Sequence, residues 1–396
     1  MLNGQIIGIG AAGAKAALAA LNAKVVSDIS DILLINSTER DIPVEYLNNG
    51  GLALQIGKNT NNMSGCGKEP AQAEEYIIEA INDGSLPKYL NSFIKPTTQK
   101  VYVVASTEGG TGCGAAPVVA AYINSKVEID EDGNTMPVHV FAFTGFEEDS
   151  RGLKNTVRFF SKLSDTLTVE VIRNKKFLIE TNNNFAKAEE MANIEFATRL
   201  SITLGNPIVA SDQNMDEREL IKTSTHPGYL NTEYREITEK IKNQAQFDEL
   251  LQDMIDQSKY MDVSDRSQKI LAVIVNIPEK ERGCIDNYFK PIREAFGEPF
   301  EIFRHIQSDP NLCPFIAFIS AGMNLPIDEV KAIQDKYSER SSELRTRSKD
   351  DFFSKLGAIE DDEDDFNYNA KKTKKNDDFL ARFGTNKKNA GGMNNY

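Results

Sequence analysis

The sequence predicts an α/β protein with a doubly wound, mostly parallel sheet in the first half of the chain and a smaller α+β second half. Short β-branched runs alternate with helical patterns, which is typical of βαβ units. A segment without Pro or Gly, from Thr181 to Leu204, has apolar residues at helical spacing. After Ile359 the composition becomes charged and Asn-rich. We therefore predict one long helix between the halves and a disordered tail.

The expected elements follow in chain order. Strands are expected where β-branched residues cluster: Gln5–Ile9, Ile32–Asn36, Leu52–Ile56, Lys100–Ala105, Val138–Phe143, Thr168–Ile172, Ile270–Ile277, Phe300–Ile306 and Pro314–Ser320. Helices are expected at Gly13–Leu21, Glu69–Ile81, Ala115–Asn124, Arg151–Leu163, Thr181–Leu204, Glu279–Phe296 and 328–349. The long helix is expected to be buried through Phe185, Ala188, Met191, Ala192, Phe196 and Leu200. The last helix is expected to start behind Asp328 as N-cap, with an apolar stripe of Val330, Ile333, Tyr337 and Leu344.

These elements divide the chain into five parts. We expect an α/β domain at 1–178, a central helix at 179–205, an α+β domain at 206–327, a C-terminal helix at 328–358 and a disordered tail at 359–396.

Composition excludes several classes of protein. The four cysteines contain no Cys-x-x-Cys pair, and three histidines are too few to complete a zinc set, so neither structural zinc nor a disulfide framework is expected. The N-terminus has no signal-peptide pattern, and no stretch reaches the roughly 20 apolar residues of a membrane helix. We expect a cytoplasmic protein without membrane insertion. The formal charge of −14 opposes direct binding of nucleic acid.

Three glycine-rich loops follow strands and precede helices: GIGAAG at 8–13, SGCGK at 64–68 and EGGTGCG at 108–114. Glycine at such a junction lets backbone N–H groups converge on an anion at the positive end of a helix. One such loop is often only a tight turn. Three in series, at the carboxyl edge of a parallel sheet, favour a polyphosphate site.

Two familiar nucleotide motifs do not fit. A dinucleotide site needs an acidic residue at the end of the second strand, where this chain has Asn36-Ser37-Thr38. A P-loop needs Gly-Lys followed by Ser or Thr, but Gly57-Lys58 is followed by Asn59, and Gly67-Lys68 by Glu69.

The loops resemble those of the tubulin/FtsZ superfamily, whose phosphate loop reads G-G-G-T-G-[ST]-G. The resemblance runs in order over roughly residues 4–325. It includes Asn36-Ser37 after the second strand, GCGKEP at 65–70, the long helix, the motif N-x-D-x-x-[DE] at 214–219 and Gly228-Tyr229. It implies GTP or GDP held with Mg²⁺ through Gly10, Ala11, Ala12, Gly13, Asn36, Gly65, Cys66, Gly67, Lys68, Glu108, Gly109, Gly110, Thr111, Gly112 and Cys113.

Departures from the family pattern favour a phage or plasmid tubulin of the TubZ or PhuZ kind. Glu108 replaces the first glycine of the phosphate loop, and would lie near phosphates unless it turns outward or helps to hold Mg²⁺ through water. Cys113 replaces a Ser or Thr, and Ala11 and Ala12 replace glycines. A cell-division FtsZ is the alternative.

The resemblance also implies catalytic residues, Asn214, Asp216 and Glu219, which a head-to-tail neighbour would press against the γ-phosphate. Polymerisation would then stimulate GTP hydrolysis. The alternative is that Asp216 and Glu219 only cap a helix.

Four further residues match nucleoside-contacting positions of the family. Asn174 and Asn193 match residues that bind guanine, while Glu189 stands where the family has a stacking aromatic residue. Glu147 and Arg151 match a ribose-contacting Glu and its basic partner. Purely structural asparagines and a solvated i,i+4 ion pair are the alternatives.

The expected partner is a second copy of the chain, in a head-to-tail filament. Such a filament would move or position plasmid or phage DNA, or else serve as a division scaffold; a monomeric nucleotide-binding enzyme is the third hypothesis. The tail at 360–396 contains DDFLARF at 377–383, which resembles the adaptor-docking end of FtsZ, and a basic cluster at Lys371–Lys375. We expect an adaptor there and only weak or indirect DNA contact, unless the tail is simply a solvated segment.

Overall fold

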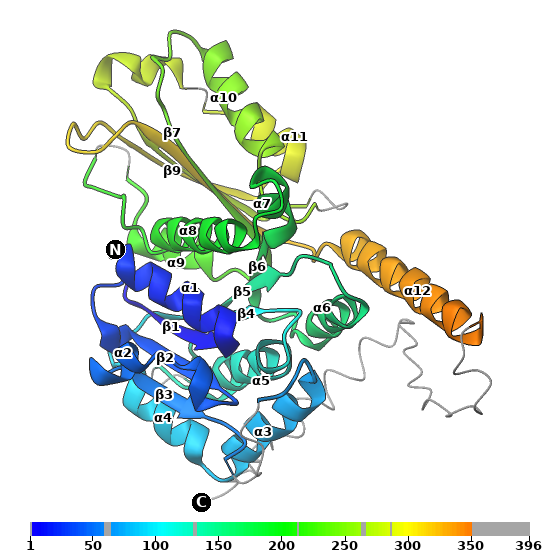
Figure 1. The fold of residues 1–396 in the computed structure, drawn as a ribbon. Helices are drawn as coiled ribbons and strands as arrows, with labels where there is room; N and C mark the ends of the chain where they lie inside the picture. Colours follow the sequence, from blue (N-terminus) through cyan, green and yellow to red (C-terminus); the bar gives the residue numbers. More distant parts are fainter. Residues whose placement is uncertain are drawn as a thin grey trace, which may run out of the picture. The chain divides into compact units, whose positions relative to one another are not determined.

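The computed structural model describes residues 2–58, 65–129, 133–211, 214–262, 267–285 and 287–350. Ser64, the end of the predicted C-terminal helix (351–358) and the predicted tail (359–396) lie outside these residues. The chain up to Ser341 forms one compact unit. Within it, one ten-stranded sheet has the order β3-β2-β1-β4-β5-β6-β7-β10-β8-β9 (Figure 1).

The first six strands are parallel and confirm the predicted doubly wound half. Their register is continuous across the sheet, because Ile7 pairs with both Leu33 and Val103. The strands are nearly continuous apolar runs since helices cover both faces. Their bounds agree with the predicted ones to within two residues: β1 Gly4–Ile9, β2 Ile32–Asn36, β3 Leu52–Gln55, β4 Lys100–Ser106, β5 Val138–Thr144 and β6 Thr168–Arg173.

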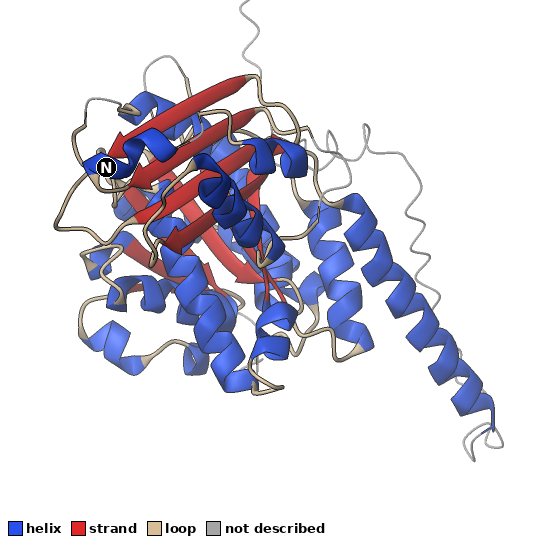
Figure 2. Ribbon diagram, turned by 90° about the horizontal axis from the view of Figure 1, so that it is seen from above, coloured by secondary structure: helices blue, strands red, loops and turns tan. Residues whose placement is uncertain are grey.

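Helices lie on both sides of this sheet (Figure 2). The crossovers from β1 to β2 and from β4 to β5 run in opposite directions along the sheet, so right-handed connections place their helices on opposite faces. On one face α1 packs against α8, and on the other α5 packs against α3 and α6. The helices of this half are α1 Gly10–Asn22, α2 Val44–Asn48, α3 Pro70–Asn82, α4 Ser85–Phe93, α5 Thr111–Lys126, α6 Ser150–Lys162 and α7 Asn174–Glu180.

The predicted long helix starts later than expected. It is α8, Phe185–Thr203, and a turn with left-handed Asn182 and Asn183 separates it from α7. Asn184 is the N-cap, because its side chain accepts a hydrogen bond from the backbone N–H of Lys187. Ala188, Ala192, Phe196 and Leu200 are buried as predicted. Phe185 and Met191 are 39% and 38% exposed, so their predicted burial was wrong.

The second half extends the same sheet. β7 (Gly228–Glu236) continues it in parallel beside β6, and β10 (Phe315–Met323) lies antiparallel between β7 and β8 (Ile270–Asn276). β9 (Glu301–Gln307) forms the edge. The strands expected at 270–277, 300–306 and 314–320 are confirmed, whereas β7 was missed. Its middle residues Asn231, Thr232 and Glu233 are polar but buried, so the strand lacks an apolar pattern.

The helices of the second half correct the prediction of one helix at 279–296. The helix expected at Glu279–Phe296 is a 3₁₀ turn at Glu279–Cys284 and a short α11 at Lys290–Phe296. The break falls at Phe289, whose φ is +53°, directly before the start of α11 and its proline, Pro291. The other helices are α9 Glu217–Ser224, α10 Gln244–Asp256 and α12 Ile327–Asp350.

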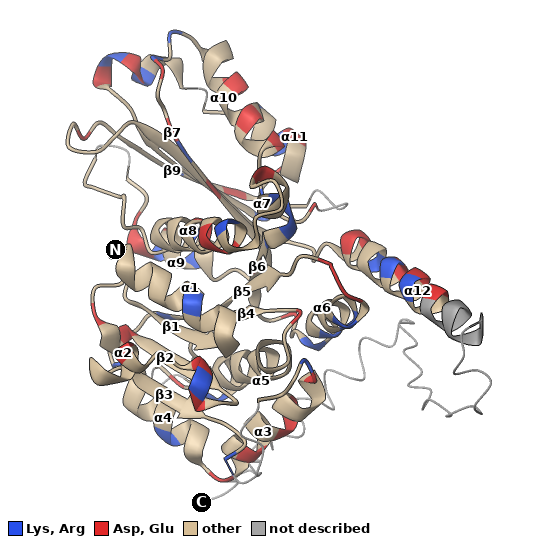
Figure 3. Ribbon diagram, viewed as in Figure 1, with Lys and Arg blue, Asp and Glu red and all other residues tan. Residues whose placement is uncertain are grey.

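Helix α12 is the predicted C-terminal helix, with acidic and basic positions alternating along it (Figure 3). It begins at Ile327, so Asp328 lies in its first turn and is not the expected N-cap. Val330 and Ile333 are buried, as their place in the predicted apolar stripe requires.

A buried network of charges lies where the two halves meet. The Arg199 guanidinium of α8 contacts the carboxylates of Glu170 on β6 (3.0 Å) and Glu233 on β7 (3.3 Å), and both acids are buried. Burial raises the pKa of Glu170 to about 7, although Arg199 acts against the shift. Buried charges are retained only when they are paired, so these residues depend on one another.

Among the described residues, none of the helices combines the length and the apolar character needed to cross a bilayer.

Candidate functional site

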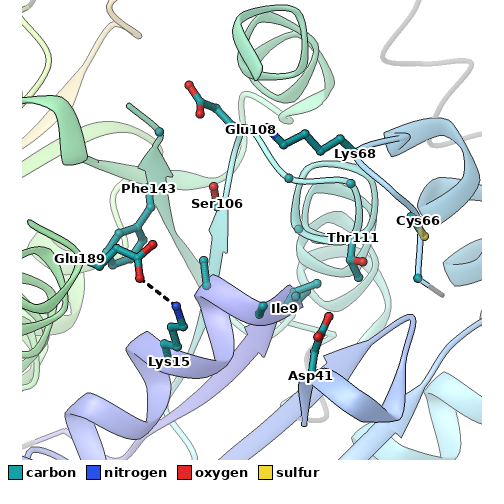
Figure 4. Close-up of a pocket in the computed structure, with 18 of the residues that line it drawn as sticks. Ile9, Lys15, Asp41, Cys66, Lys68, Ser106, Glu108, Thr111, Phe143 and Glu189 are labelled. Atoms are coloured by element: carbon teal, nitrogen blue, oxygen red, sulfur yellow. Dashed lines mark hydrogen bonds and ion pairs between the residues drawn. The ribbon is translucent and has the colours of Figure 1, made fainter. Parts of the chain in front are cut away.

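A cavity of about 480 Å³ lies at the carboxyl ends of β1, β4, β5 and β6 (Figure 4). This is the edge where open α/β sheets bind ligands. All three glycine-rich loops reach it. The predicted residues that line it are Gly10, Ala11, Ala12, Gly65, Cys66, Gly67, Lys68, Glu108, Gly109, Gly110, Thr111, Gly112, Asn174 and Asn193.

Two helices begin at this cavity. Helix α1 starts at Gly10 and α5 at Thr111, and the first residues of both line the cavity. The Gly10 backbone is left-handed, with φ +73°, and a Cβ there would lie 3.1 Å from the backbone nitrogen of Gly112. Only glycine therefore lets the two helix starts approach this closely. The first N–H groups of a helix have no partner within the helix, so two positive helix ends face one space.

The third loop is held against the phosphate loop. A Cβ on Gly110 would lie 3.0 Å from the backbone nitrogen of Lys68, so the two loops touch. The Asn155 side-chain amide donates to the backbone oxygens of both Lys68 (3.1 Å) and Glu108 (3.0 Å). Thr111 adds a hydrogen bond of 2.7 Å between its hydroxyl and that of Ser37. The loops thus form one preorganised wall.

Glu108 turns away from the phosphate loop. Figure 4 shows its carboxylate directed away from Thr111 and Cys66. Its Oε1 accepts a hydrogen bond of 3.0 Å from the backbone N–H of Glu147. Burial raises the pKa of Glu108, which reflects the cost of holding this carboxylate out of water. The outward orientation is one of the two options that the sequence left open.

The opposite end of the cavity carries asparagines and aromatic rings. Asn174 and Asn193 line it together with Phe143 and Phe146. The side-chain oxygen of Asn174 is buried and has no hydrogen-bond partner in the described structure. A buried acceptor without a partner is costly. Glu189, in place of the family's stacking aromatic residue, forms a 2.8 Å ion pair with Lys15 beside the cavity (Figure 4).

Five predicted ligand residues do not line the cavity. Gly13 packs α1 against β4, since a Cβ there would lie 2.2 Å from the Val104 backbone oxygen. The side-chain oxygen of Asn36 accepts from the Ser37 N–H. Arg151 forms a 3.1 Å ion pair with Glu69, so the i,i+4 pair with Glu147 is not formed.

Cys113 and Glu147 are the other two predicted ligand residues that do not line the cavity. The Cys113 thiol is buried and donates to the Asn155 backbone oxygen at 3.1 Å. Burial raises the pKa of this thiol to about 12, so it stays neutral. The Glu147 carboxylate instead accepts hydrogen bonds from two lysines, Lys175 and Lys336.

The predicted catalytic residues also lie outside the cavity. Asp216 is the N-cap of α9: its Oδ1 accepts from the Glu219 N–H at 2.8 Å, and the Glu219 carboxylate accepts from the Asp216 N–H at 3.0 Å. The side-chain oxygen of Asn214 accepts from the Ser211 N–H. This capping box is the structural alternative that the sequence left open. It does not exclude a role at a neighbour's site, because Asn214 and Asp216 are exposed.

Sequence reasoning missed several cavity residues. Lys15 follows Ala11 by one helical turn, so helical spacing alone would have placed it on the same face of α1. Ser37 directly follows Asn36, and only Asn36 of this pair was predicted to hold the nucleotide. The remainder come from the ends of other elements and carry no local signal: Asp41, Ser106, Phe143, Gly145, Phe146 and Ala192.

Two glycine substitutions should separate packing from ligand binding. We expect Gly13→Ala to lower the free energy of unfolding by about 1–3 kcal/mol, because its methyl group collides with backbone. Gly109 has no atom within 4 Å of an added Cβ, so Gly109→Ala should change that free energy by less than about 0.5 kcal/mol. Its methyl group would project beside the cavity and should weaken nucleotide binding. Urea unfolding and a binding titration measure the two effects; a Gly13→Ala variant as stable as the wild type would contradict the packing role.

Comparison with solved structures identifies the fold. CetZ2 from Haloferax volcanii, solved as a GTPγS-bound protofilament, is 14% identical with a TM-score of 0.68, over 86% of this chain and all of CetZ2 (100%). TubZ of Bacillus thuringiensis serovar israelensis, also a GTPγS-form protofilament, is 15% identical with a TM-score of 0.66, over 87% of this chain and 94% of TubZ. An FtsZ dimer of M. jannaschii is 18% identical with a TM-score of 0.57, over 81% and 88%.

The chain therefore has the fold of the tubulin/FtsZ superfamily, and the predicted fold class is confirmed. Among curated proteins it is similar to cell division protein FtsZ 1 of Pyrococcus woesei, at 23% identity over 248 residues, 61% of this chain and 56% of that protein. It is also similar to FtsZ of Rhizobium radiobacter, at 32% identity over 143 residues, 35% of this chain and 22% of that protein. The matches thus span about half, or less, of these relatives. No protein-family model matches the chain.

Proposed function

We propose that this protein is a GTPase that binds GTP in the cavity and assembles head to tail into filaments. The observation that carries the proposal is the convergence of the α1 and α5 N-termini on one cavity, with the predicted acidic residues outside it. The converging helix N-termini would bind phosphates. Because the acidic residues lie outside the cavity, a single chain would lack the groups that align the attacking water.

The phosphates would lie at the helix starts. Backbone N–H groups of Gly10, Gly109, Gly110, Thr111 and Gly112 supply the donors that fixed phosphates need. Mg²⁺ is usually held in such sites by one or two carboxylates, phosphate oxygens and waters. Asp41 and the hydroxyls of Ser37 and Thr111 lie at the same cavity and fit that role. When bound, the ion would neutralise phosphate charge.

The nucleoside would lie at the asparagine end. The buried side-chain oxygen of Asn174 has no partner, and once turned into the cavity it would accept from the N–H donors on the Watson–Crick edge of guanine. Phe143 and Phe146 offer apolar surface for the base and sugar. Guanine therefore fits this end better than a base with only acceptors facing Asn174.

Hydrolysis would be completed at the contact between subunits. Asp216 and Glu219 would approach the γ-phosphate of a neighbouring chain and align the attacking water. Both are held at the start of α9 by the capping box, which fixes their backbone. A head-to-tail contact that does not close into a ring yields a filament. The protofilament states of the CetZ2 and TubZ structures support this mode of assembly.

Sedimentation tests the proposal. At a concentration of about 10 µM, the protein should pellet with GTP or a non-hydrolysable analogue and stay in the supernatant with GDP, because the γ-phosphate completes the contact between subunits. The GTPase rate per chain should rise with protein concentration. A protein that stays monomeric with GTP, or that hydrolyses it at a constant rate per chain, would refute filament-coupled hydrolysis and favour a monomeric enzyme.

For the biological role we propose movement or positioning of plasmid or phage DNA in a bacterial cytoplasm. The departures in the phosphate loop and the similarity to TubZ structures support it. A division scaffold is the second candidate, because the two FtsZ relatives described above are division proteins. With a net charge of −14, the chain would reach DNA through an adaptor bound to residues 360–396.

A variant without these residues should keep its GTPase activity and lose the adaptor; unchanged adaptor binding would refute that role of the tail.

A further inference from the structure

Glu147 holds the phosphate-loop residue Glu108 in place. It follows β5, and its backbone has φ +60°, a left-handed conformation that is rare for glutamate. In this conformation its N–H donates to the Glu108 carboxylate at 3.0 Å. The Glu108 carboxylate also lies close to Gly145 and Gly152; a Cβ on Gly145 would lie 1.9 Å from Glu108 Oε2. Glu108 thus occupies a slot beside the cavity.

The C-terminal helix in turn holds Glu147. The Glu147 carboxylate, only 9% exposed, accepts hydrogen bonds of 2.8 Å from both Lys175 of α7 and Lys336 of α12. Its backbone oxygen accepts from Arg340 of α12 at 2.9 Å. A strained conformation persists only where its surroundings hold it, and α12 supplies two of these three cations.

The start of α12 is anchored independently of Glu147. Val330 and Ile333 are buried, and Glu329 forms a 3.1 Å ion pair with Arg173. Lys336 and Arg340 lie one to three turns further along the helix. They can therefore be removed without removing the apolar contacts of its first turns.

We propose that α12 controls nucleotide binding through Glu147, which acts as a positioning residue for Glu108. With α12 docked, the Glu108 carboxylate stays in its slot; with α12 released, this carboxylate is free to enter the cavity and repel the phosphates. Coupling is reciprocal, so nucleotide binding also strengthens the docking of α12. A partner that binds α12 or the chain beyond it thereby changes nucleotide affinity. The inference rests on the proposed function, because it concerns the same site.

The test is the double variant Lys336→Ala/Arg340→Ala. We expect the GTP dissociation constant, measured with a non-hydrolysable analogue below the assembly concentration, to rise about five-fold or more. Amide hydrogen exchange of residues 145–151 should become faster even without nucleotide, because the Glu147 N–H is no longer held. In a Glu108→Gln background the same double variant should leave affinity unchanged, because a neutral amide does not repel phosphate.

Two controls separate this coupling from a general loss of structure. Lys331→Ala removes a lysine of α12 whose ion pair in the described part of the chain is with Asp328 of the same helix, at 3.5 Å, and it should change neither readout. Lys336→Arg should keep the wild-type affinity, because guanidinium also pairs with carboxylate.

The outcomes are distinct. A five-fold loss that persists in the Glu108→Gln background would overturn the coupling through Glu108, and unchanged exchange of 145–151 would overturn the role of α12. Wild-type protein that binds no GTP would instead refute the proposed function, and the coupling with it.

Discussion

Asp216→Asn is expected to leave GTP binding and assembly intact and to slow hydrolysis by about 100-fold or more, the size of a general-base contribution. The structure makes this substitution cleaner than Asp216→Ala. Asp216 Oδ1 caps α9 by accepting from the Glu219 N–H at 2.8 Å, and asparagine is an equally good N-cap. The asparagine keeps the loop in place and removes only the charge. GTP turnover and pelleting, measured on the same samples, check the result.

Glu217→Gln is the matched control. Glu217 is the next residue, is exposed, and also lies in the first turn of α9. The Glu217→Gln variant should hydrolyse GTP at close to the wild-type rate. Wild-type turnover by Asp216→Asn would show that Asp216 only caps the helix.

A mixing experiment tests whether the acid acts on a neighbouring chain. Asp216→Asn keeps the cavity but lacks the acid, while Gly109→Ala keeps the acid and is expected to bind nucleotide weakly. Mixed in equal amounts, they should hydrolyse GTP faster than the sum of the two alone, because some contacts join an intact cavity to an intact acid. Rates that only add would place the acid and its nucleotide in the same chain.

Arg199→Met is expected to lower the free energy of unfolding by about 3–5 kcal/mol, because it leaves two buried carboxylates, Glu170 and Glu233, without their counterion. Arg158→Met is the matched control. Arg158 is partly exposed and pairs with the buried carboxylate of Glu74, which also pairs with Lys162, so Glu74 keeps a counterion and this variant should lose no more than about 1 kcal/mol. Urea unfolding measures both losses, provided that the slope of unfolding free energy against urea concentration is the same in each variant. Equal losses in the two variants would refute the idea that the cost comes from leaving buried carboxylates without a counterion.

The loss in Arg199→Met should also depend on pH. Burial raises the pKa of Glu170 from 4.5 to about 7, so the folded state holds this proton more tightly than the unfolded state. The stabilisation from protonated Glu170 is full below pH 4.5 and is lost as pH rises through 7. A neutral Glu170 needs no counterion. Arg199→Met should therefore lose less stability at pH 5 than at pH 8, and a loss independent of pH would contradict this account.

Local sequence was sufficient for every strand except β7, for the longer helices and for the glycine loops. Gly10, Gly110 and Thr111 could be assigned to one site because parallel strands place their carboxyl ends at one edge. Sequence alone could not exclude Gly13 or Cys113, since a residue inside a motif can face either the ligand or the core. The helix predicted at 279–296 was wrong because its pattern spans a backbone break at Phe289.

The sequence by itself determined that this chain forms a mostly parallel α/β sheet with three glycine-rich turns at one edge, because strand patterns and glycine conformations are local properties. Only the tertiary structure decided which side chains meet across distant segments. It pairs Lys15 with Glu189, buries Arg199 between Glu170 and Glu233, and brings Lys336 of the last helix to Glu147. These contacts join residues far apart in the chain, and their free energy depends on burial and geometry that no local pattern encodes.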